Sequence, residues 1–294
     1  MAHNNKLLTA FLHVFFTIMC IACIIPVLMV ISASLSSEAS LVEYGYTIFP
    51  KELSLDSYKF VFSSSNSIFK AYGITIFVTV VSVILGVMTT AMYAYVITRP
   101  YFKQSQLFSF ISYFTMLFNG GLVATYLINV KVLNLSNSIL ALILPGTFTA
   151  WNVMVTKSFF NVSVPDSIVE SAKIDGAGEF KIFMQIVMPI SLPCIATIAL
   201  FITMSKWNDW MSPMLYVTEP DLYTLSFLLQ NMLLNIQQLM ENAAESGVSH
   251  QMEQIPSEGA RMALCIIAAG PILIAYPFFQ KYFVQGMTVG AVKG

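Results

Sequence analysis

The sequence predicts an all-α membrane protein with several transmembrane helices. Of its 294 residues, 57% are apolar and only 10% are charged, whereas a soluble domain carries about 25% charged residues. Apolar runs recur that reach about 20 residues, the length at which a helix crosses the hydrocarbon core of a bilayer. Membrane lipid is therefore expected to surround the chain. The net charge of −1 gives no indication of a nucleic-acid partner.

Six stretches are long and apolar enough to be spans. They are about 7–34, 70–97, 105–128, 138–160, 191–217 and 260–282. The third is interrupted by Asn119-Gly120-Gly121, and the fifth contains Lys206 and Asp209. The first is too long for a signal sequence, so we expect it to be retained as a helix. The whole chain then forms one transmembrane domain.

The distribution of Lys and Arg predicts the orientation. With six spans both termini lie on one side, and a cytoplasmic placement puts more basic residues in the inner loops, as the positive-inside rule favours. These inner residues are Lys6, Arg99, Lys103, Lys157, Lys173, Lys181, Lys281 and Lys293. The outer ones are Lys51, Lys59, Lys70, Lys131 and Arg261. The polar segment 163–190 then faces the cytoplasm.

A long outer segment, residues 218–259, contains apolar residues at helical spacing. They are Leu225, Leu228, Leu229, Met232, Leu233 and Ile236. This period predicts an amphipathic helix. Two interpretations stand: the helix is a docking surface for an external substrate-delivery protein, or it packs over the outer ends of the spans.

The segment 163–190 reads as two short helices joined by a tight turn. Ser163-Val164-Pro165-Asp166 is a helix start, with a candidate serine cap, an early proline and an acidic first turn. Asp175-Gly176 supplies the turn, because glycine accepts positive φ. Glu179 begins the second helix, and Pro189 marks its end.

Side chains on these two helices suggest a rigid knob for a cytoplasmic partner. Glu170 and Lys173 lie one helical turn apart, where they can pair. Phe180 and Phe183 form an apolar ridge suited to a groove on a partner. The alternative is an amphipathic helix lying at the membrane surface.

The spacing within this segment resembles the coupling loop of bacterial ABC importer permeases, which reads Glu-Ala-Ala, then Asp-Gly-Ala, then Ile-x-Leu-Pro. The matching residues are Glu170, Ala172, Asp175, Gly176, Ala177, Phe183, Ile186, Pro189 and Pro193. Ser171 replaces the usual middle alanine and Met188 the usual leucine before the proline. Both replacements roughly keep size or apolarity.

Other segments extend the resemblance over about residues 7–294. Trp207-Asn208-Asp209-Trp210 with Pro213 is similar to an element in the fifth span of carbohydrate-importer permeases. The tail from Gly286 to Gly294 is similar to that of the maltose-type second permease subunit. Three further stretches resemble the branch of that family linked to complex oligosaccharide and polysaccharide fragments. They are Phe118–Gly121, Leu144–Gly146 and Tyr276–Phe283.

The resemblance implies a permease subunit of a binding-protein-dependent ABC importer in the bacterial plasma membrane. Such a subunit moves oligosaccharides into the cytoplasm by ATP-driven alternating access. Its implied partners are a second homologous permease, two ABC ATPase subunits and an extracytoplasmic sugar-binding protein. ATP and Mg²⁺ would bind on the partner ATPase, so no cofactor is expected in this chain. The residues implied in ATPase coupling are Glu170, Ala172, Asp175, Gly176, Ala177 and Phe183.

The motifs of enzymes are missing from the sequence. It contains no Gly-x-x-x-x-Gly-Lys-Ser/Thr phosphate loop, no His-Glu-x-x-His zinc motif and no Gly-x-Ser-x-Gly elbow. Cys20 and Cys23 form a C-x-x-C pattern, but they lie in an apolar run where buried thiols are expected. We therefore predict no catalytic residue and no metal site.

Polar and aromatic residues inside predicted spans are the candidates for the substrate path, because burying polar groups in a membrane is costly. They are Trp207, Asn208, Asp209 and Trp210 in the fifth span and Trp151 and Asn152 in the fourth, with Asn119 and Tyr126 as further candidates. Two structural interpretations compete. The tryptophans are interfacial anchors, or Lys206 and Asp209 form an ion pair.

Two other functional classes remain open from the sequence. One is an ABC permease for another solute, such as a peptide or amino acid, against which the tail and the Trp-Asn-Asp element argue. The other is a secondary transporter, which needs buried proton or sodium ligands and often inverted repeats. Only Lys206 and Asp209 are plausible ionisable groups for that role, and no repeat is visible.

Overall fold

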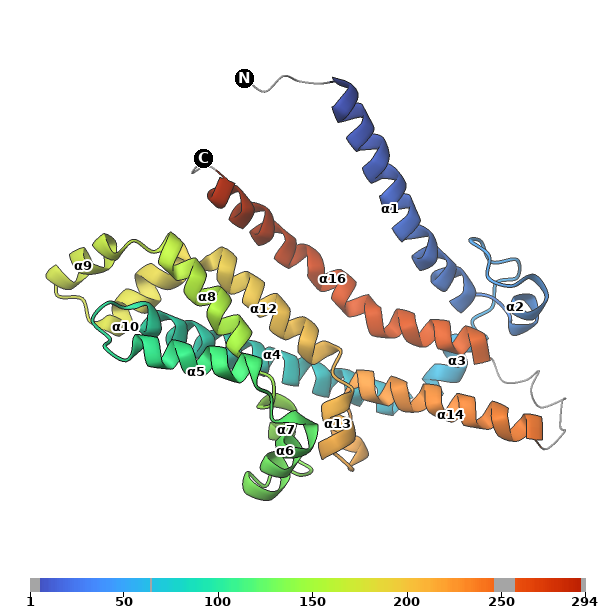
Figure 1. Ribbon diagram of the computed structural model, residues 1–294. Helices are drawn as coiled ribbons and strands as arrows, with labels where there is room; N and C mark the ends of the chain where they lie inside the picture. Colours follow the sequence, from blue (N-terminus) through green and yellow to red (C-terminus); the bar gives the residue numbers. More distant parts are fainter. Residues whose placement is uncertain (1–5, 64, 246–256, 292–294) are drawn as a thin grey trace. The chain divides into compact units, whose positions relative to one another are not determined.

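The computed structural model describes residues 6–63, 65–245 and 257–291, which form helices joined by turns and loops (Figure 1). This part of the chain contains no β-strand, only an isolated antiparallel bridge between Ser36 and Leu53. The all-α prediction is therefore confirmed for the described residues.

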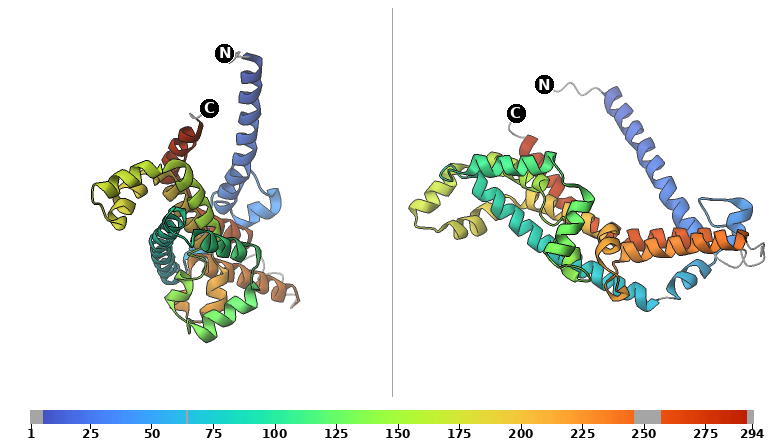
Figure 2. Two further views of the ribbon diagram at one scale, coloured as in Figure 1. Left: turned by 60° about the vertical axis from the view of Figure 1, so that its left-hand side comes forward. Right: turned by 60° about the horizontal axis from the view of Figure 1, so that its bottom comes forward.

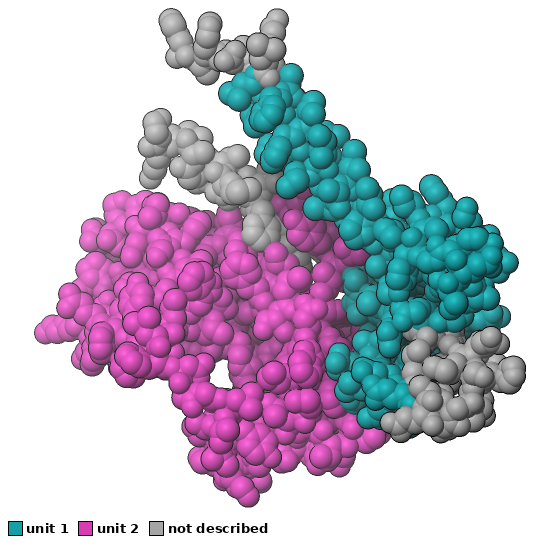
Figure 3. Space-filling model, turned by 45° about the vertical axis from the view of Figure 1, so that its right-hand side comes forward, with its two compact units in different colours: residues 1–68, 229–271 teal, residues 69–228, 272–294 magenta. Residues whose placement is uncertain are grey.

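The chain divides into two compact units (Figure 3). Unit 1 comprises residues 1–68 and 229–271, and unit 2 comprises residues 69–228 and 272–294. Three long helices have residues in both units. They are α4 (Ser65–Thr98), α14 (Leu225–Glu245) and α16 (Ser257–Ala291).

Unit 1 contains three further helices, α1 (Lys6–Ser34), α2 (Glu38–Tyr44) and α3 (Asp56–Phe62). The first turn of α16 has backbone N–H groups without partners in the helix, and Glu38 supplies acceptors for two of them. Its carboxylate oxygens accept from the N–H of Glu258 at 3.1 Å and of Gly259 at 3.2 Å. A negative charge at a helix N-terminus is also favoured by the helix dipole. This cap fixes α2 to the start of α16.

Unit 2 holds most of the shorter helices. They are α5 (Ser105–Leu117), α6 (Gly121–Leu127), η1 (Ile128–Val132), α7 (Ile139–Ile143), α8 (Ala150–Ser163), α9 (Asp166–Ile174), α10 (Glu179–Ile182), η2 (Phe183–Val187), α11 (Met188–Ile190), α12 (Leu192–Trp207), α13 (Met211–Tyr216) and η3 (Pro220–Leu222). In every view α9 and α10 lie at one end of this unit, away from α6, α7 and α13 (Figure 1, Figure 2).

Helix α4 supplies residues to successive apolar clusters of unit 2. Val78 packs in a cluster with α7 and α13, Val87 in one with α12, and Ala91, Ala94 and Tyr95 in one with α8, α9, α10 and η2. Because these clusters follow one another along α4, this helix links the α13 end of the unit to the α9–α10 end.

Gly86 allows neighbouring chain segments to approach α4 closely. A Cβ at this position would lie 2.6 Å from the Thr147 carbonyl oxygen and 2.7 Å from Ile202 Cδ1. Atoms in well-packed interiors do not approach so closely, so a larger residue would force the segments apart.

Two described helices, within α1 and α4, are long and apolar enough to cross a membrane, or up to four if each of two bent pairs is one span. The bent pairs coincide with predicted breaks. The helices α5 and α6 are bent by 115° at Phe118–Gly120, and the segment Glu179–Ile190 is bent by 84° from α12. The region 138–160 is two helices, α7 and α8, separated by residues 144–149. The number of six spans stays a prediction.

The remaining predicted spans are matched by helices of differing length. The first corresponds to α1, the second to α4, and 260–282 lies within α16. Helix α12 has 16 residues, which is about 24 Å at 1.5 Å per residue, and the helix ends with Asn208 as its C-cap. Residues 292–294, the end of the tail quoted above, lie outside the described residues.

Candidate functional site

The predicted helix-turn-helix is present, and its turn is a Schellman motif. Helix α9 ends at Ile174, and Gly176 follows with φ of +79°. The Ala177 N–H donates to the Ala172 carbonyl at 2.9 Å, and the Gly176 N–H donates to the Lys173 carbonyl at 3.0 Å. This pair of bonds satisfies carbonyl groups at the helix end and requires a left-handed residue, which is why glycine stands there.

The start of α9 differs from the prediction. Its N-cap is Pro165, with no side-chain cap, while Ser163 is the last residue of α8. Proline suits this position because it lacks an N–H and its ring fixes φ. The predicted serine cap is therefore wrong, although the helix itself begins at Asp166.

The six predicted coupling residues fall into surface and core groups. Glu170, Asp175 and Gly176 are exposed, whereas Ala172 and Ala177 are half-buried against the apolar cluster under α9 and α10. Phe183 is 3% exposed, and its ring centroid lies 5.4 Å from that of Tyr95. The predicted ridge of Phe180 and Phe183 is therefore wrong, because the Phe183 side chain is buried in the core.

Two other apolar side chains are the most exposed ones of the helix-turn-helix. Ile174 is 87% exposed at the end of α9, and Phe180 is 65% exposed on α10. Both side chains are accessible to a partner. Their role in docking remains a prediction.

The predicted ion pair of Glu170 with Lys173 is also replaced by another. Lys173 Nζ lies 2.6 Å from Glu179 Oε1, across the turn, and 3.6 Å from the ring centroid of Tyr101. Sequence spacing suggested the neighbour on the same helix, but the Schellman turn folds α10 back toward α9. Tertiary proximity, not helical period, selected the partner.

Three residues near the C-terminal end of α4 contact the helix-turn-helix and were missed by the sequence analysis as site residues. The Tyr95 hydroxyl donates to Glu179 Oε2 at 2.7 Å, and Arg99 Nη1 lies 3.4 Å from Asp166 Oδ1. The ring of Tyr101 lies under the Lys173 ammonium group. The sequence offers one hint of this contact: a basic residue, Arg99, and two tyrosines stand at the end of the second apolar run. In the sequence analysis Arg99 was used only to predict the orientation of the chain.

Two of the candidate translocation residues, Asn119 and Asp209, line a groove of about 500 Å³ in unit 2. Its lining includes hydroxyl, amide, carboxylate and ammonium groups, which suit the hydroxyls of a sugar. The lining residues are Asn119, Gly121, Leu122, Thr125, Pro145, Gly146, Ser205, Lys206, Asp209, Met211, Ser212, Leu215 and Tyr216. Asn119 and Asp209, which the sequence suggested as substrate-path residues, thus line one groove although they stand 90 positions apart.

Lys206 and Asp209 line the same groove but have separate partners. Lys206 is 3% exposed, and its Nζ donates to the carbonyl oxygens of Leu142 at 2.7 Å and Pro145 at 2.5 Å. Asp209 Oδ1 accepts from the Ser212 N–H at 2.9 Å, at the start of α13. No ion pair joins the two among the described residues, so the predicted structural ion pair is not formed.

The other predicted path residues lie away from the groove lining. Trp207 is buried, with its ring centroid 6.4 Å from that of Tyr72. Asn208 donates to the Met204 carbonyl at 2.8 Å. Trp210 and Trp151 are exposed, and Asn152 is buried in the first turn of α8. The structure therefore unites Asp209 with Asn119 and leaves these five elsewhere.

Tyr216 anchors the groove wall and was not singled out by the sequence. Its Oη accepts from Asn129 Nδ2 at 3.0 Å, and its ring stacks on Tyr126 with centroids 5.9 Å apart. Tyr126 was named as a candidate and supports the wall by this stacking. These contacts fix α13 against α6 and η1.

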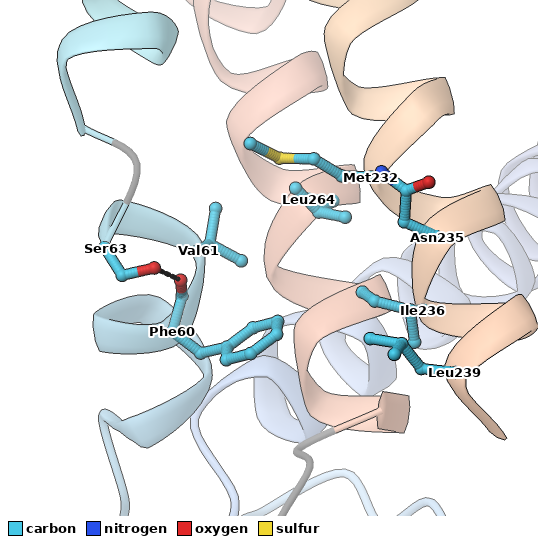
Figure 4. A pocket seen from close by; sticks show the side chains of 8 residues that line it. All are labelled: Phe60, Val61, Ser63, Met232, Asn235, Ile236, Leu239 and Leu264. Atoms are coloured by element: carbon cyan, nitrogen blue, oxygen red, sulfur yellow. Dashed lines mark hydrogen bonds between the residues drawn. The ribbon is translucent and has the colours of Figure 1, made fainter. Parts of the chain in front are cut away.

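A second, smaller pocket of about 130 Å³ lies in unit 1 (Figure 4). Phe60 and Val61 of α3, Ile236 and Leu239 of α14 and Leu264 of α16 line it. The amphipathic helix α14 thus lies with part of its apolar side toward α3 and α16 within unit 1. Both interpretations of this segment, a docking surface and a helix over the outer ends of the spans, stay predictions. The pocket is too small and apolar for an oligosaccharide.

The long apolar helices, together with a groove that several polar side chains line, are those of a membrane-embedded helical protein. The chain belongs to the family of binding-protein-dependent transport system inner membrane components, whose model matches residues 84–289. It is therefore a membrane transport component, and the family inferred from the coupling-loop resemblance is confirmed.

Individual relatives cover nearly the whole chain. It is 35% identical over 291 residues to the polygalacturonan/rhamnogalacturonan transport system permease protein YtcP of Bacillus subtilis (strain 168), covering 99% of this chain and 100% of YtcP. It is 38% identical over 271 residues to Protein LplC of the same organism, covering 92% of this chain and 90% of LplC.

The fold is also similar to a solved structure. A bacterial ABC transporter involved in the import of the acidic polysaccharide alginate matches with a TM-score of 0.80 and 23% identity. The match covers 96% of this chain and 99% of the other. The helical fold thus matches that of an ABC transporter permease.

Proposed function

We propose that this chain is one of two non-identical permease subunits of an ABC importer that moves oligosaccharides into the cytoplasm. The observation that carries the proposal is the helix-turn-helix of α9 and α10 in a chain of the binding-protein-dependent transport family. Its exposed Ile174 and Phe180, beside Glu170 and Asp175, provide a mixed apolar and acidic surface for an ATPase partner.

In this proposal the partners perform the chemistry. Two ABC ATPase subunits bind ATP and Mg²⁺, since this sequence contains no phosphate loop. Their closure moves the helix-turn-helix and, with it, the helices of the permease. Six spans with both termini in the cytoplasm place α9 and α10 on the ATPase side. The transport cycle is then a rigid-body alternation between outward and inward access.

The groove lined by Asn119, Lys206 and Asp209 is the proposed part of the substrate path in this subunit. A volume of about 500 Å³ accommodates one or two sugar rings, within the usual range of ligand sites. The names of YtcP and of the alginate transporter both refer to acidic polysaccharides. We therefore propose an oligosaccharide that contains uronic acid units as the cargo, delivered by an extracytoplasmic binding protein.

Affinity purification from native membranes in gentle detergent, followed by mass spectrometry, tests the assembly. Recovery of a second permease, an ABC ATPase and a sugar-binding protein is expected. Recovery of the chain alone at good yield would instead favour a secondary transporter.

Uptake into proteoliposomes tests the cargo. The purified complex, with its binding protein outside and ATP inside, should accumulate oligogalacturonate in preference to a neutral oligosaccharide of the same length. Preference for the neutral sugar would contradict the acidic class while leaving the importer assignment intact.

A further inference from the structure

The Glu179 carboxylate joins three elements of unit 2. Its Oε2 accepts from the Tyr95 hydroxyl of α4 at 2.7 Å, and its Oε1 lies 2.6 Å from Lys173 Nζ of α9. Glu179 itself begins α10. One side chain therefore bonds the two coupling helices to each other and to α4.

A second bond joins α9 to the end of α4. Arg99 is only 3% exposed and lies 3.4 Å from Asp166 at the start of α9. Its guanidinium carbon lies 4.8 Å from the centroid of the Tyr95 ring, a cation–π arrangement. Tyr95 therefore supports both connections, through its hydroxyl and through its ring.

These polar bonds matter for α9 because its apolar contacts are few. Within α9 only Val169 is buried, whereas α10 and η2 together bury Ile182, Phe183 and Val187 against α4 and α8. Apolar packing thus holds α10 and η2 firmly. The position of α9, which carries Glu170, depends to a larger degree on its polar bonds.

The charges of Lys173 and Glu179 support these polar bonds. Burial alone would raise the pKa of Glu179, but hydrogen bonds from Lys173, Tyr95 and Tyr101 outweigh it and lower that pKa below its ordinary value. Burial alone would lower the pKa of Lys173, but hydrogen bonds to Glu179 and Tyr101 outweigh it and raise that pKa. Both groups are therefore charged at neutral pH.

We propose that Tyr95 and Glu179 are positioning residues that tie α9 to α4, so that a displacement of the coupling helices is passed to this long helix. Neither residue belongs to the coupling motif. Through Val78, α4 packs in one cluster with Tyr216 of the groove wall. This proposal rests on the proposed function, since it assumes that a partner moves α9 and α10. Helix α4 carries the displacement because it contributes to every major cluster between the two ends of the unit.

The test measures how many ATP molecules the complete importer hydrolyses per sugar transported in proteoliposomes. Tyr95→Phe removes one hydroxyl and keeps the ring contacts with Phe183 and Arg99, and Glu179→Gln removes the charge. We expect each change to raise the ratio about fivefold, the effect of losing one partly exposed charge-assisted hydrogen bond. The amount of ATPase that copurifies should not change.

Two matched controls lie close to these positions. Tyr93→Phe removes a hydroxyl from the same helix, one that donates to the Phe108 carbonyl of α5 instead. Lys181→Gln removes a cation from α10 that forms no ion pair in the described part of the chain. Both should keep the ratio of the unmodified importer.

Rescue separates positioning from a purely structural role. Lys173→Glu alone should raise the ratio, and combining it with Glu179→Lys should restore it in part. The reversed pair can re-form and the Tyr95 hydroxyl can accept from a lysine, whereas the contact of Lys173 with the Tyr101 ring is lost. Ratios equal to that of the unmodified importer for Tyr95→Phe and Glu179→Gln would overturn the proposal. A lower protein yield with an unchanged ratio would also overturn it. Failure of the unmodified complex to transport any saccharide would refute the proposed function instead.

Discussion

Replacing Gly176 with valine should uncouple ATP hydrolysis from transport. Gly176 has φ of +79°, and no atom beyond its two chain neighbours lies within 4 Å of where its Cβ would be. The penalty is therefore conformational and not a clash. A left-handed conformation costs an L-residue about 1–2 kcal/mol, and a β-branched side chain makes φ above zero a true outlier.

That cost shifts the equilibrium of the turn by a factor of about 5 to 30. The Schellman bonds of Ala177 and Gly176 would loosen, and the angle between α9 and α10 would no longer be fixed. We expect sugar-dependent ATPase activity to fall by about that factor, while the binding protein keeps its affinity for sugar. The assay is ATP hydrolysis and uptake by the reconstituted importer, with and without loaded binding protein.

The same loop supplies two controls. Gly178 is the N-cap of α10, with φ of −71° and no atom beyond its chain neighbours within 4 Å of its hypothetical Cβ. Gly178→Ser adds a side chain that suits an N-cap and should have little effect. Gly176→Asn should retain most activity, since asparagine tolerates the left-handed region. Normal coupling in a normally expressed Gly176→Val protein would refute the role assigned to this turn.

Three further predictions follow from the structure. Gly86→Val should lower membrane expression and thermal stability by overpacking against Thr147, at a cost of about 1–3 kcal/mol; an unchanged melting temperature would contradict the close approach. Asp209→Asn keeps an oxygen to cap α13 but loses the charge-assisted hydrogen bond that the carboxylate can accept from a sugar hydroxyl, so uptake should fall about tenfold with the ATPase still bound. Loss of expression alone would favour a structural role. The pair of Lys173 and Glu179 should contribute constant stability between about pH 5 and pH 10. This stabilisation is lost at lower pH, as the lowered pKa of Glu179 is reached, and at higher pH, as the raised pKa of Lys173 is reached. The melting temperatures of Glu179→Gln and of the unmodified protein should therefore differ by the same amount at pH 6 and at pH 8.

Much of the helix-turn-helix was predictable because its signals are local. Pro165, Gly176 and Pro189 each restrict their own backbone, so the helices and turn lie close to where the sequence places them. The coupling motif likewise depends on short spacings that one stretch of sequence contains. The break of the third apolar run at Asn119 to Gly121 was visible for the same reason.

The errors concern which face of a short helix is buried and which charges pair. Phe180 and Phe183 look equivalent in the sequence, yet only Phe183 faces Tyr95 and the core. Lys173 had a suitable neighbour in Glu170, but the returning chain brought Glu179 closer. Neither outcome follows from helical period, because both depend on where α4 and α10 lie.

By itself the sequence determined that the chain is helical and membrane-embedded, where its two short helices turn, and to which family it belongs. These properties follow from hydropathy, from backbone restrictions at Gly and Pro, and from motif spacing. The tertiary structure alone decided that Asn119 and Asp209 share one groove, that Lys206 bonds to carbonyls and not to Asp209, and that α4 contacts α9 and α10. Such contacts join residues far apart in sequence, and only packing in three dimensions selects them.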